Sequence, residues 1–133
     1  MRVHPYLSFN GQCEEAFRFY EKTLGGKIQE FFRYEGSPMA KDAPPEFGKK
    51  ILHVTMIVDN DILSGADAPP QYFSKTEGMS VTIALSDTAE GERIFNALAD
   101  GGTVKMKFGV TFWAKGFGMV IDRWGIPWMI NCD

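Results

Sequence analysis

Cysteine is scarce in this chain of 133 residues, and membrane and secretion signals are missing. Cys13 and Cys132 are its two cysteines, too few for a disulfide framework or a zinc knuckle. No stretch reaches the roughly 18 consecutive apolar residues of a membrane-spanning helix. The first residues lack the apolar core of a signal peptide. We therefore expect a cytoplasmic protein with free thiols and no membrane partner.

Positive charge is also scarce. The 14 Lys and Arg residues are outnumbered by 17 Asp and Glu residues, and Lys49 and Lys50 are the one adjacent basic pair. Binding of nucleic acid needs a basic patch or stripe, so we expect no nucleic-acid partner. The sequence also lacks a GxGxxG turn, a P-loop and a GxSxG nucleophile elbow.

What the sequence does contain is a regular order of secondary-structure signals. Alternating apolar and polar residues predict a strand over 3–9, and apolar residues at helical spacing predict a helix over 12–24. Gly25 and Gly26 end this helix. A loop rich in Gly and Pro is expected over 35–50. Three more strands are expected in this half: 27–34, 51–58 and 61–66.

The same order begins again near residue 79. A strand over 79–85 precedes a helix introduced by Asp87, with Glu90 three residues later at the spacing of a capping box. Gly101 and Gly102 end this second helix. Three strands are expected to follow it: 103–110, 117–121 and 126–132.

The two halves superimpose along the sequence. A constant shift of 76 residues places Phe9 on Leu85 and the first glycine pair on the second. A repeat of this kind decides the fold class. We therefore predict a single domain, residues 1–133, built from βαβββ modules over 1–67 and 79–133 and joined by a loop over 68–78.

Motifs at both ends carry a family resemblance. They are Pro5–Phe9, Glu15–Tyr20, Leu24–Gly26, Phe112–Ala114, Phe117–Gly118, Asp122–Gly125 and Ile126–Asn131. With these motifs the sequence resembles the vicinal oxygen chelate superfamily, which includes glyoxalase I, bleomycin- and fosfomycin-resistance proteins and extradiol dioxygenases. The tail, together with His53 and Ser64–Pro69, is similar to the PhnB-like branch. Its members often carry the label 3-demethylubiquinone-9 3-methyltransferase.

The resemblance implies an α+β architecture, the glyoxalase/bleomycin-resistance fold. Its two βαβββ modules would form a curved mixed sheet that encloses a cleft. It also implies a homodimer in which modules pair across chains.

The resemblance further implies where a metal would bind. Superfamily metalloenzymes use four His and Glu ligands, from the first and last strands of each module, to polarise substrate oxygens. Here His4 keeps one position, Ser80 replaces a second, and Met129 stands where a Glu belongs. A thioether is a poor ligand for hard ions. We expect no metal and no other cofactor, although a rearranged divalent-metal site of His4, His53 and Asp67 stays open.

Polar residues beside aromatic ones suggest a binding site for a small molecule. Such sites are largely apolar and contain a few convergent polar groups, although aromatic side chains also serve simple core packing. The predicted ligand-binding residues are Thr55, Ser80, Phe112, Trp113, Trp128 and Asn131.

We therefore expect a PhnB-like protein that binds a small aromatic or oxygenated molecule. If it is an enzyme, His53 is the acid–base group, because imidazole titrates near neutral pH. Asp67 would orient it and His4 would assist. The alternatives are a binding protein that sequesters a drug without chemistry, a metalloenzyme with a rearranged site, and the methyltransferase of the family label. A cofactor turn rich in glycine, which would support the last, is missing after the first strand.

Three residues have structural interpretations. Cys13 falls on the buried face of the first helix. Asp122 is expected to hold a turn with its side chain. Cys132, near the C-terminus, is expected to be exposed and open to oxidation.

Overall fold

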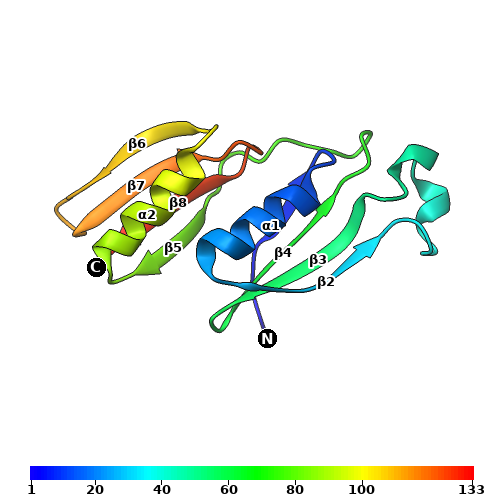
Figure 1. The fold of residues 1–133 in the computed structure, drawn as a ribbon. Helices are drawn as coiled ribbons and strands as arrows, with labels where there is room; N and C mark the ends of the chain where they lie inside the picture. Colours follow the sequence, from blue (N-terminus) through cyan, green and yellow to red (C-terminus); the bar gives the residue numbers. More distant parts are fainter. The chain divides into compact units, whose positions relative to one another are not determined.

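The chain uses one order of elements twice. The computed structural model describes residues 1–133, and these divide into two compact units, Met1–Ser74 and Lys75–Asp133. Both units run strand, helix and then three strands (Figure 1). The predicted α+β class and the βαβββ repeat are confirmed. The unit boundary falls inside the predicted joining loop, residues 68–78.

Unit 1 contains one four-stranded mixed sheet and one long helix. Its elements are β1 (Tyr6–Phe9), α1 (Cys13–Leu24), β2 (Lys27–Arg33), β3 (Ile51–Val58) and β4 (Asp61–Asp67). The strand order is β1-β4-β3-β2, with β1 parallel to β4 and the other pairs antiparallel. The predicted loop between β2 and β3 contains two short 3-10 helices, η1 (Ala40–Asp42) and η2 (Pro45–Phe47).

Unit 2 repeats this topology in a second four-stranded sheet. Its elements are β5 (Val81–Leu85), α2 (Thr88–Ala99), β6 (Thr103–Gly109), β7 (Gly116–Ile121) and β8 (Pro127–Cys132). The strand order is β5-β8-β7-β6, and β5 is parallel to β8. The eight strands therefore form two sheets of four, one in each unit.

The first strand is shorter than the alternation predicted. Its ladder begins with the pair Tyr6 and Ser64, so Val3 and His4 lie outside it. Pro5 has no N–H to donate to a neighbouring strand, which explains why the ladder does not extend toward the N-terminus.

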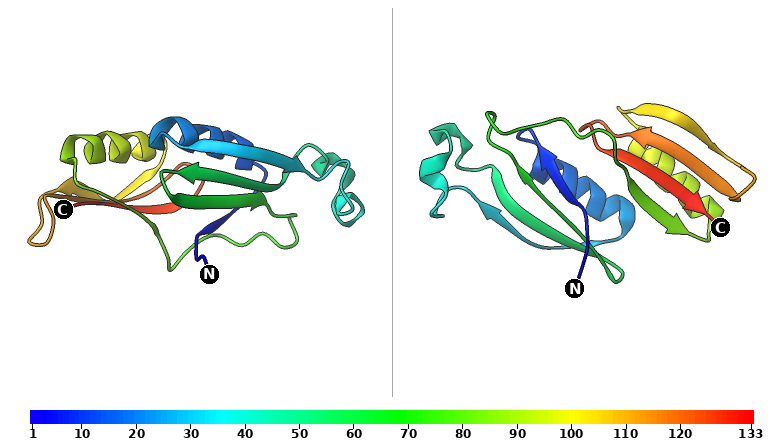
Figure 2. Two further views of the ribbon diagram at one scale, coloured as in Figure 1. Left: turned by 90° about the horizontal axis from the view of Figure 1, so that it is seen from below. Right: turned by 180° about the vertical axis from the view of Figure 1, so that it is seen from behind.

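In unit 1, α1 packs on one face of its sheet (Figure 2). Phe17 of α1 is fully buried, and its ring meets that of Phe9 edge to face at 6.0 Å between centroids. Gly65 in β4 allows this close approach, because a Cβ there would lie 2.8 Å from the Phe17 ring and 2.8 Å from the Leu7 carbonyl oxygen.

In unit 2, α2 packs on one face of the second sheet in the same manner (Figure 2). Ile94, Phe95 and Leu98 supply its buried side. Gly118 of β7 leaves room for Phe95, since a Cβ there would lie 2.7 Å from the ring. Neither α1 nor α2 is long and apolar enough to cross a membrane.

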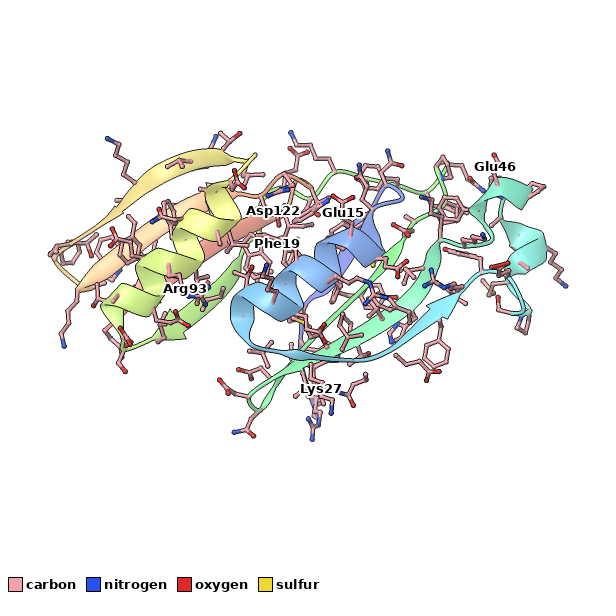
Figure 3. The ribbon with its side chains drawn as sticks, viewed as in Figure 1. Glu15, Phe19, Lys27, Glu46, Arg93 and Asp122 are labelled. Carbon is pink, nitrogen blue, oxygen red and sulfur yellow. The ribbon has the colours of Figure 1, made fainter.

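Two of the structural interpretations are confirmed. Cys13 is fully buried. Asp122, labelled in Figure 3, lies after β7, and its Oδ1 accepts hydrogen bonds from the backbone of Trp124 at 2.9 Å and of Ile126 at 3.0 Å. The predicted capping spacing of α2 is also found, because the Asp87 side chain accepts from the Glu90 N–H at 3.1 Å.

The expectation for Cys132 is wrong. Its side chain is fully buried, and a Cβ on Gly91 of α2 would lie 2.3 Å from the Cys132 sulfur. The alternation of β8 turns this thiol toward α2, although it is next to the C-terminal residue. Burial raises its pKa, so the thiol stays protonated.

Candidate functional site

One face of the unit 1 sheet is not covered by α1. Val54 and Gly65 are directly paired in β3 and β4, and Gly65 faces Phe17 of α1. Alternation along each strand sends the next side chains to the opposite side of the sheet. We call this side the open face, and the side chains that matter on it are Tyr6, Phe32, His53, Thr55 and Ser64.

A continuous chain of hydrogen bonds crosses the open face. The Tyr6 hydroxyl lies 3.1 Å from Nδ1 of His53, and Nε2 of His53 lies 3.1 Å from Oγ1 of Thr55. Thr55 Oγ1 is in turn 3.3 Å from Oγ of Ser64. Both ring nitrogens of His53 therefore have partners. The chain joins residues from β1, β3 and β4.

The hydrogen-bond chain runs from the protein surface at Tyr6 into the interior at Ser64. Tyr6 is 51% exposed, whereas Ser64 is 1% exposed. Two rings flank the imidazole of His53: the Tyr6 centroid lies 5.6 Å from it, and the half-exposed Phe32 ring 6.4 Å. The surface end of the chain thus combines a hydroxyl group with exposed aromatic area.

The Tyr6 hydroxyl keeps its proton at neutral pH. Partial burial, followed by the nearby Cys13 and Tyr34 side chains, raises the pKa of Tyr6 above its ordinary value of 10.0. A protonated phenol both donates and accepts hydrogen bonds. The open face therefore offers a hydroxyl and an imidazole, groups suited to binding an oxygen atom or relaying a proton.

Asp67, predicted to orient His53, is placed elsewhere. It is 1% exposed, and its carboxylate accepts from the backbone N–H of Cys13 at 2.9 Å and of Ile51 at 2.9 Å. Alternation along β4 puts Asp67 on the α1 side with Gly65, so the sheet separates it from His53. Its visible role is to hold the starts of α1 and β3.

Cys13 is not an activated nucleophile. Burial raises its pKa, and the carboxylates of Asp67 and Glu14 raise it further. The thiolate, which would be the reactive form, is disfavoured at this position.

The remaining predicted acid–base group, His4, precedes β1 and is exposed. It lies outside the hydrogen-bond chain. In the whole chain, no three His, Cys, Asp or Glu side chains are grouped so that they could hold a metal ion. Within unit 1, the residues present therefore do not fit the rearranged site of His4, His53 and Asp67.

In unit 2, three predicted ligand-binding residues come together. The Trp113 indole N–H donates to Oδ1 of Asn131 at 3.1 Å. The Phe112 ring meets Trp113 edge to face at 4.8 Å, and Phe112 is 97% exposed. These residues form a second exposed aromatic surface with one amide group.

The other two predicted ligand-binding residues of unit 2 are not part of this surface. Trp128 is 1% exposed, and its indole N–H donates to Oδ2 of Asp122 at 2.8 Å. The alternation of β8 turns Trp128 toward the core together with Ile130. Ser80 precedes β5 and is half-buried.

Sequence reasoning missed Tyr6 and Ser64 as site residues. Tyr6 alternates with buried Leu7, so its place on the polar face of β1 was readable. Its contact with His53 was not, because the two residues are 47 positions apart and meet through the order β1-β4-β3.

Comparisons with known proteins agree on one family. The family model described as 3-demethylubiquinone-9 3-methyltransferase matches residues 1–131. Protein YjdN of Escherichia coli K12 is 32% identical over 141 residues, which cover 98% of this chain and 95% of YjdN.

Solved structures share the fold over the full length. Protein PA1353 from Pseudomonas aeruginosa is 41% identical, with a TM-score of 0.92 over 100% of this chain and 98% of that protein. A PhnB protein from Bacillus cereus is 23% identical, with a TM-score of 0.84 over 100% of both chains, and shows the fold. A possible glyoxalase from Bacillus cereus (17%) and the fosfomycin-resistance protein FosX (7%) share the fold at lower identity. Since the family model spans nearly the whole chain, this protein belongs to the family described as 3-demethylubiquinone-9 3-methyltransferase, and it shares its fold with a possible glyoxalase and a fosfomycin-resistance protein.

Proposed function

We propose that this protein binds a small aromatic or oxygenated molecule on the open face of unit 1. The observation that carries the proposal is the hydrogen-bond chain that ends at the exposed Tyr6 hydroxyl, with the His53 imidazole flanked by the rings of Tyr6 and Phe32. Small-molecule sites combine apolar area with a few placed polar groups, and this face has both. Phe32 and Tyr6 offer exposed ring surface. The hydrogen bonds behind them already hold the polar groups in place.

If the protein is an enzyme, the chemistry is acid–base chemistry centred on His53. Imidazole can accept and return a proton near neutral pH. The family description names a methyl transfer, but β1 is followed by Asn10 and Gly11 and not by a cofactor turn rich in glycine. We therefore do not propose methyl transfer.

A second candidate is a binding protein without chemistry, and one observation favours it. The surface of Phe112, Trp113 and Asn131 is exposed, aromatic and lacks a titratable group. Such a surface can hold a flat ligand but cannot move a proton. This candidate places the ligand in unit 2.

The experiment is a fragment screen by NMR on the full chain, with small aromatic acids, ketones and phenols. We expect ligands to shift resonances of the open face, and His53→Ala to abolish this binding while circular dichroism stays unchanged. Tyr72→Phe, which removes the hydroxyl of an exposed tyrosine that takes no part in the hydrogen-bond chain, is the control. His4→Ala measures whether His4 assists.

The two candidates give different results. Shifts confined to Trp113 and Asn131, insensitive to His53→Ala, would move the ligand to unit 2 and favour sequestration. Conversion of a bound fragment that stops in His53→Ala would favour an enzyme.

The proposal includes no metal and no other cofactor. Elemental analysis, before and after dialysis against zinc, nickel, manganese and iron, checks this. One tightly held ion per chain would contradict it and make Lewis-acid chemistry the leading mechanism. We also propose a cytoplasmic homodimer, as the superfamily resemblance implies. A monomer mass by light scattering at micromolar concentration would contradict the dimer.

A further inference from the structure

The hydrogen-bond chain on the open face has a direction that can be derived from its protons. It contains three hydroxyl groups and one imidazole. Neutral imidazole donates from one nitrogen and accepts at the other, and each hydroxyl donates one proton. The four groups therefore supply four protons to three hydrogen bonds, and one proton must point out of the chain.

Three arrangements satisfy the three bonds. In one, Tyr6 donates to Nδ1 while Nε2 and Ser64 both donate to Thr55, so the Thr55 proton is left over. Thr55 is half-buried and its hydroxyl has no partner besides His53 and Ser64, which leaves that proton without an acceptor in the protein. The other two arrangements each run in one direction. In the inward arrangement, Tyr6 donates to His53 Nδ1, Nε2 donates to Thr55, and Thr55 donates to Ser64. The Ser64 proton is then left over. In the outward arrangement, Ser64 donates to Thr55, Thr55 donates to Nε2, and Nδ1 donates to the Tyr6 oxygen. The Tyr6 proton is then left over.

Burial decides between these arrangements. Ser64 is 1% exposed, and Thr55 is the one partner of its hydroxyl, so a leftover proton there has no acceptor. A buried donor without an acceptor costs the free energy of its desolvation. Tyr6 is 51% exposed, and its leftover proton can reach solvent or a ligand at no such cost. The outward arrangement is therefore favoured, and successive donors polarise one another in the same direction.

We propose that Tyr6 is the residue that contacts the ligand, held as an outward donor by Ser64, Thr55 and His53, and that the ligand presents an acceptor oxygen such as a carboxylate or ketone oxygen. This rests on the proposed function and names its ligand class. In ligand binding His53 is then a positioning residue, and the acid–base role proposed for it would act through the Tyr6 hydroxyl: both its nitrogens are engaged inside the hydrogen-bond chain, and its Nδ1–H tautomer fixes Tyr6 as the donor. The flanking rings of Tyr6 and Phe32 select an aromatic body beside that oxygen.

The tautomer of His53 tests the direction without any ligand. Long-range proton–nitrogen NMR at a pH where the ring is neutral distinguishes a protonated ring nitrogen from an unprotonated one. We expect protonated Nδ1 and unprotonated Nε2. Thr55→Val removes the donor to Nε2 and should give a mixture of tautomers, while Thr55→Ser keeps the hydroxyl and should restore the Nδ1–H form. An Nε2–H tautomer in the unchanged protein overturns the inference.

Binding of matched probes tests the ligand class. Benzoate and acetophenone carry acceptor oxygens, benzylamine carries a donor, and toluene carries the ring alone. We expect Tyr6→Phe to weaken benzoate binding at the open face roughly 10- to 100-fold, the value of one hydrogen bond to a charged group. Toluene binding should not change. Tyr72→Phe is the control for a lost tyrosine hydroxyl elsewhere in unit 1.

The failures of the two proposals are distinguishable. Benzoate that binds the open face equally well in Tyr6→Phe overturns this inference and leaves the proposed function standing. Preference for benzylamine over benzoate does the same. If neither acceptor probe nor any screened fragment shifts the NMR resonances of the open face, both the proposed function and the proposed ligand class are wrong.

Discussion

The two units share a topology but hold the start of their helices by different means. Phe9 of β1 pairs with Asp67 of β4, and Leu85 of β5 pairs with Cys132 of β8, so Asp67 and Cys132 occupy equivalent places. In unit 1 the Asp67 carboxylate accepts from the first backbone N–H of α1, that of Cys13. In unit 2 the equivalent place holds a thiol, and the cap comes from Asp87, next to the helix.

The difference teaches that a helix cap need not be local. Gln12, the residue before α1, makes no side-chain capping bond, and the cap comes instead from 54 positions away along the chain. The other oxygen of Asp67 binds the N–H of Ile51, where β3 begins after the long loop. One buried carboxylate therefore ties three parts of unit 1 together, whereas Asp87 is exposed and serves α2 alone.

The largest expected effect follows from removing these caps. Asp67→Ala leaves two buried N–H groups without an acceptor and should lower the free energy of unfolding by roughly 2–5 kcal/mol. Asp87→Ala should cost only about 1 kcal/mol, as for an ordinary N-cap. Urea unfolding monitored by hydrogen exchange measures both, with faster exchange expected in α1 for the first variant and in α2 for the second.

A local cap added to α1 sharpens this comparison. Gln12→Asp in the Asp67→Ala background should recover at most about 1 kcal/mol, because it can serve α1 but not Ile51. Equal losses from Asp67→Ala and Asp87→Ala would show that the two caps are equivalent and that the long-range tie has no special weight.

The next effect comes from the contact between helix and final strand. Gly91 of α2 packs against Cys132, and Ala16, fully buried, stands at the corresponding place in α1. Gly91→Ala would bring a methyl group into the Cys132 sulfur and should cost about 1–3 kcal/mol through overpacking. Thermal and urea unfolding measure this loss.

A double-mutant cycle shows whether the sulfur is the cause. Cys132→Ala makes room for the new methyl group, so the cost of Gly91→Ala should fall by more than half in that background. If the cost stays the same, the clash with Cys132 does not explain it.

The smallest expected effect concerns ion pairs on the helices. Glu14 of α1 accepts two hydrogen bonds from Arg33, at 3.0 and 3.1 Å, and two from Arg18, at 2.8 and 3.2 Å. The Arg33 bond, followed by that from Arg18, lowers the pKa of Glu14 from 4.5 to about 2. In unit 2, Glu90 has one such partner, Arg93, whose hydrogen bond also lowers its pKa.

Because the pKa of Glu14 is depressed in the folded state, its contribution is present above pH 4.5 and is lost as the pH falls toward 2. Glu14→Gln should flatten the loss of stability over this range. The effect at neutral pH should be below about 1 kcal/mol, since the pair is partly exposed and screened by salt. Urea unfolding from pH 7 to 2 measures it, and Glu90→Gln should change the profile less. A steeper acid loss in Glu14→Gln would contradict the role given to Arg33.

Most of the fold could be predicted from local patterns. Alternation located β1 and β3, helical spacing located α1 and α2, and the glycine pairs marked both helix ends. Asp122 was readable as a turn residue because Asx side chains bind their own local backbone. These features depend on residues only a few positions apart, so they can be recognised from the spacing of apolar, polar and glycine residues along the sequence.

The candidate site could be predicted only in part from the sequence. His53 and Thr55 lie two residues apart on one strand, so alternation placed them on one face, and the structure joins them by a hydrogen bond. Asp67 was assigned to His53 although it turns to the other side of β4, where backbone N–H groups of α1 and β3 meet it. Composition and order along the chain do not reveal such long-range polar partners.

By itself the sequence therefore determined the repeat, the types of the helices and strands, the family, and the side of β1 and β3 that carries polar residues. Only the tertiary structure decided that Tyr6, His53, Thr55 and Ser64 form one chain, that Asp67 caps α1, and that Trp128 and Cys132 lie in the core. The physical reason is that periodicity follows from local backbone geometry, whereas a hydrogen bond between strands depends on sheet order and register. Those are set when residues distant along the chain pack together.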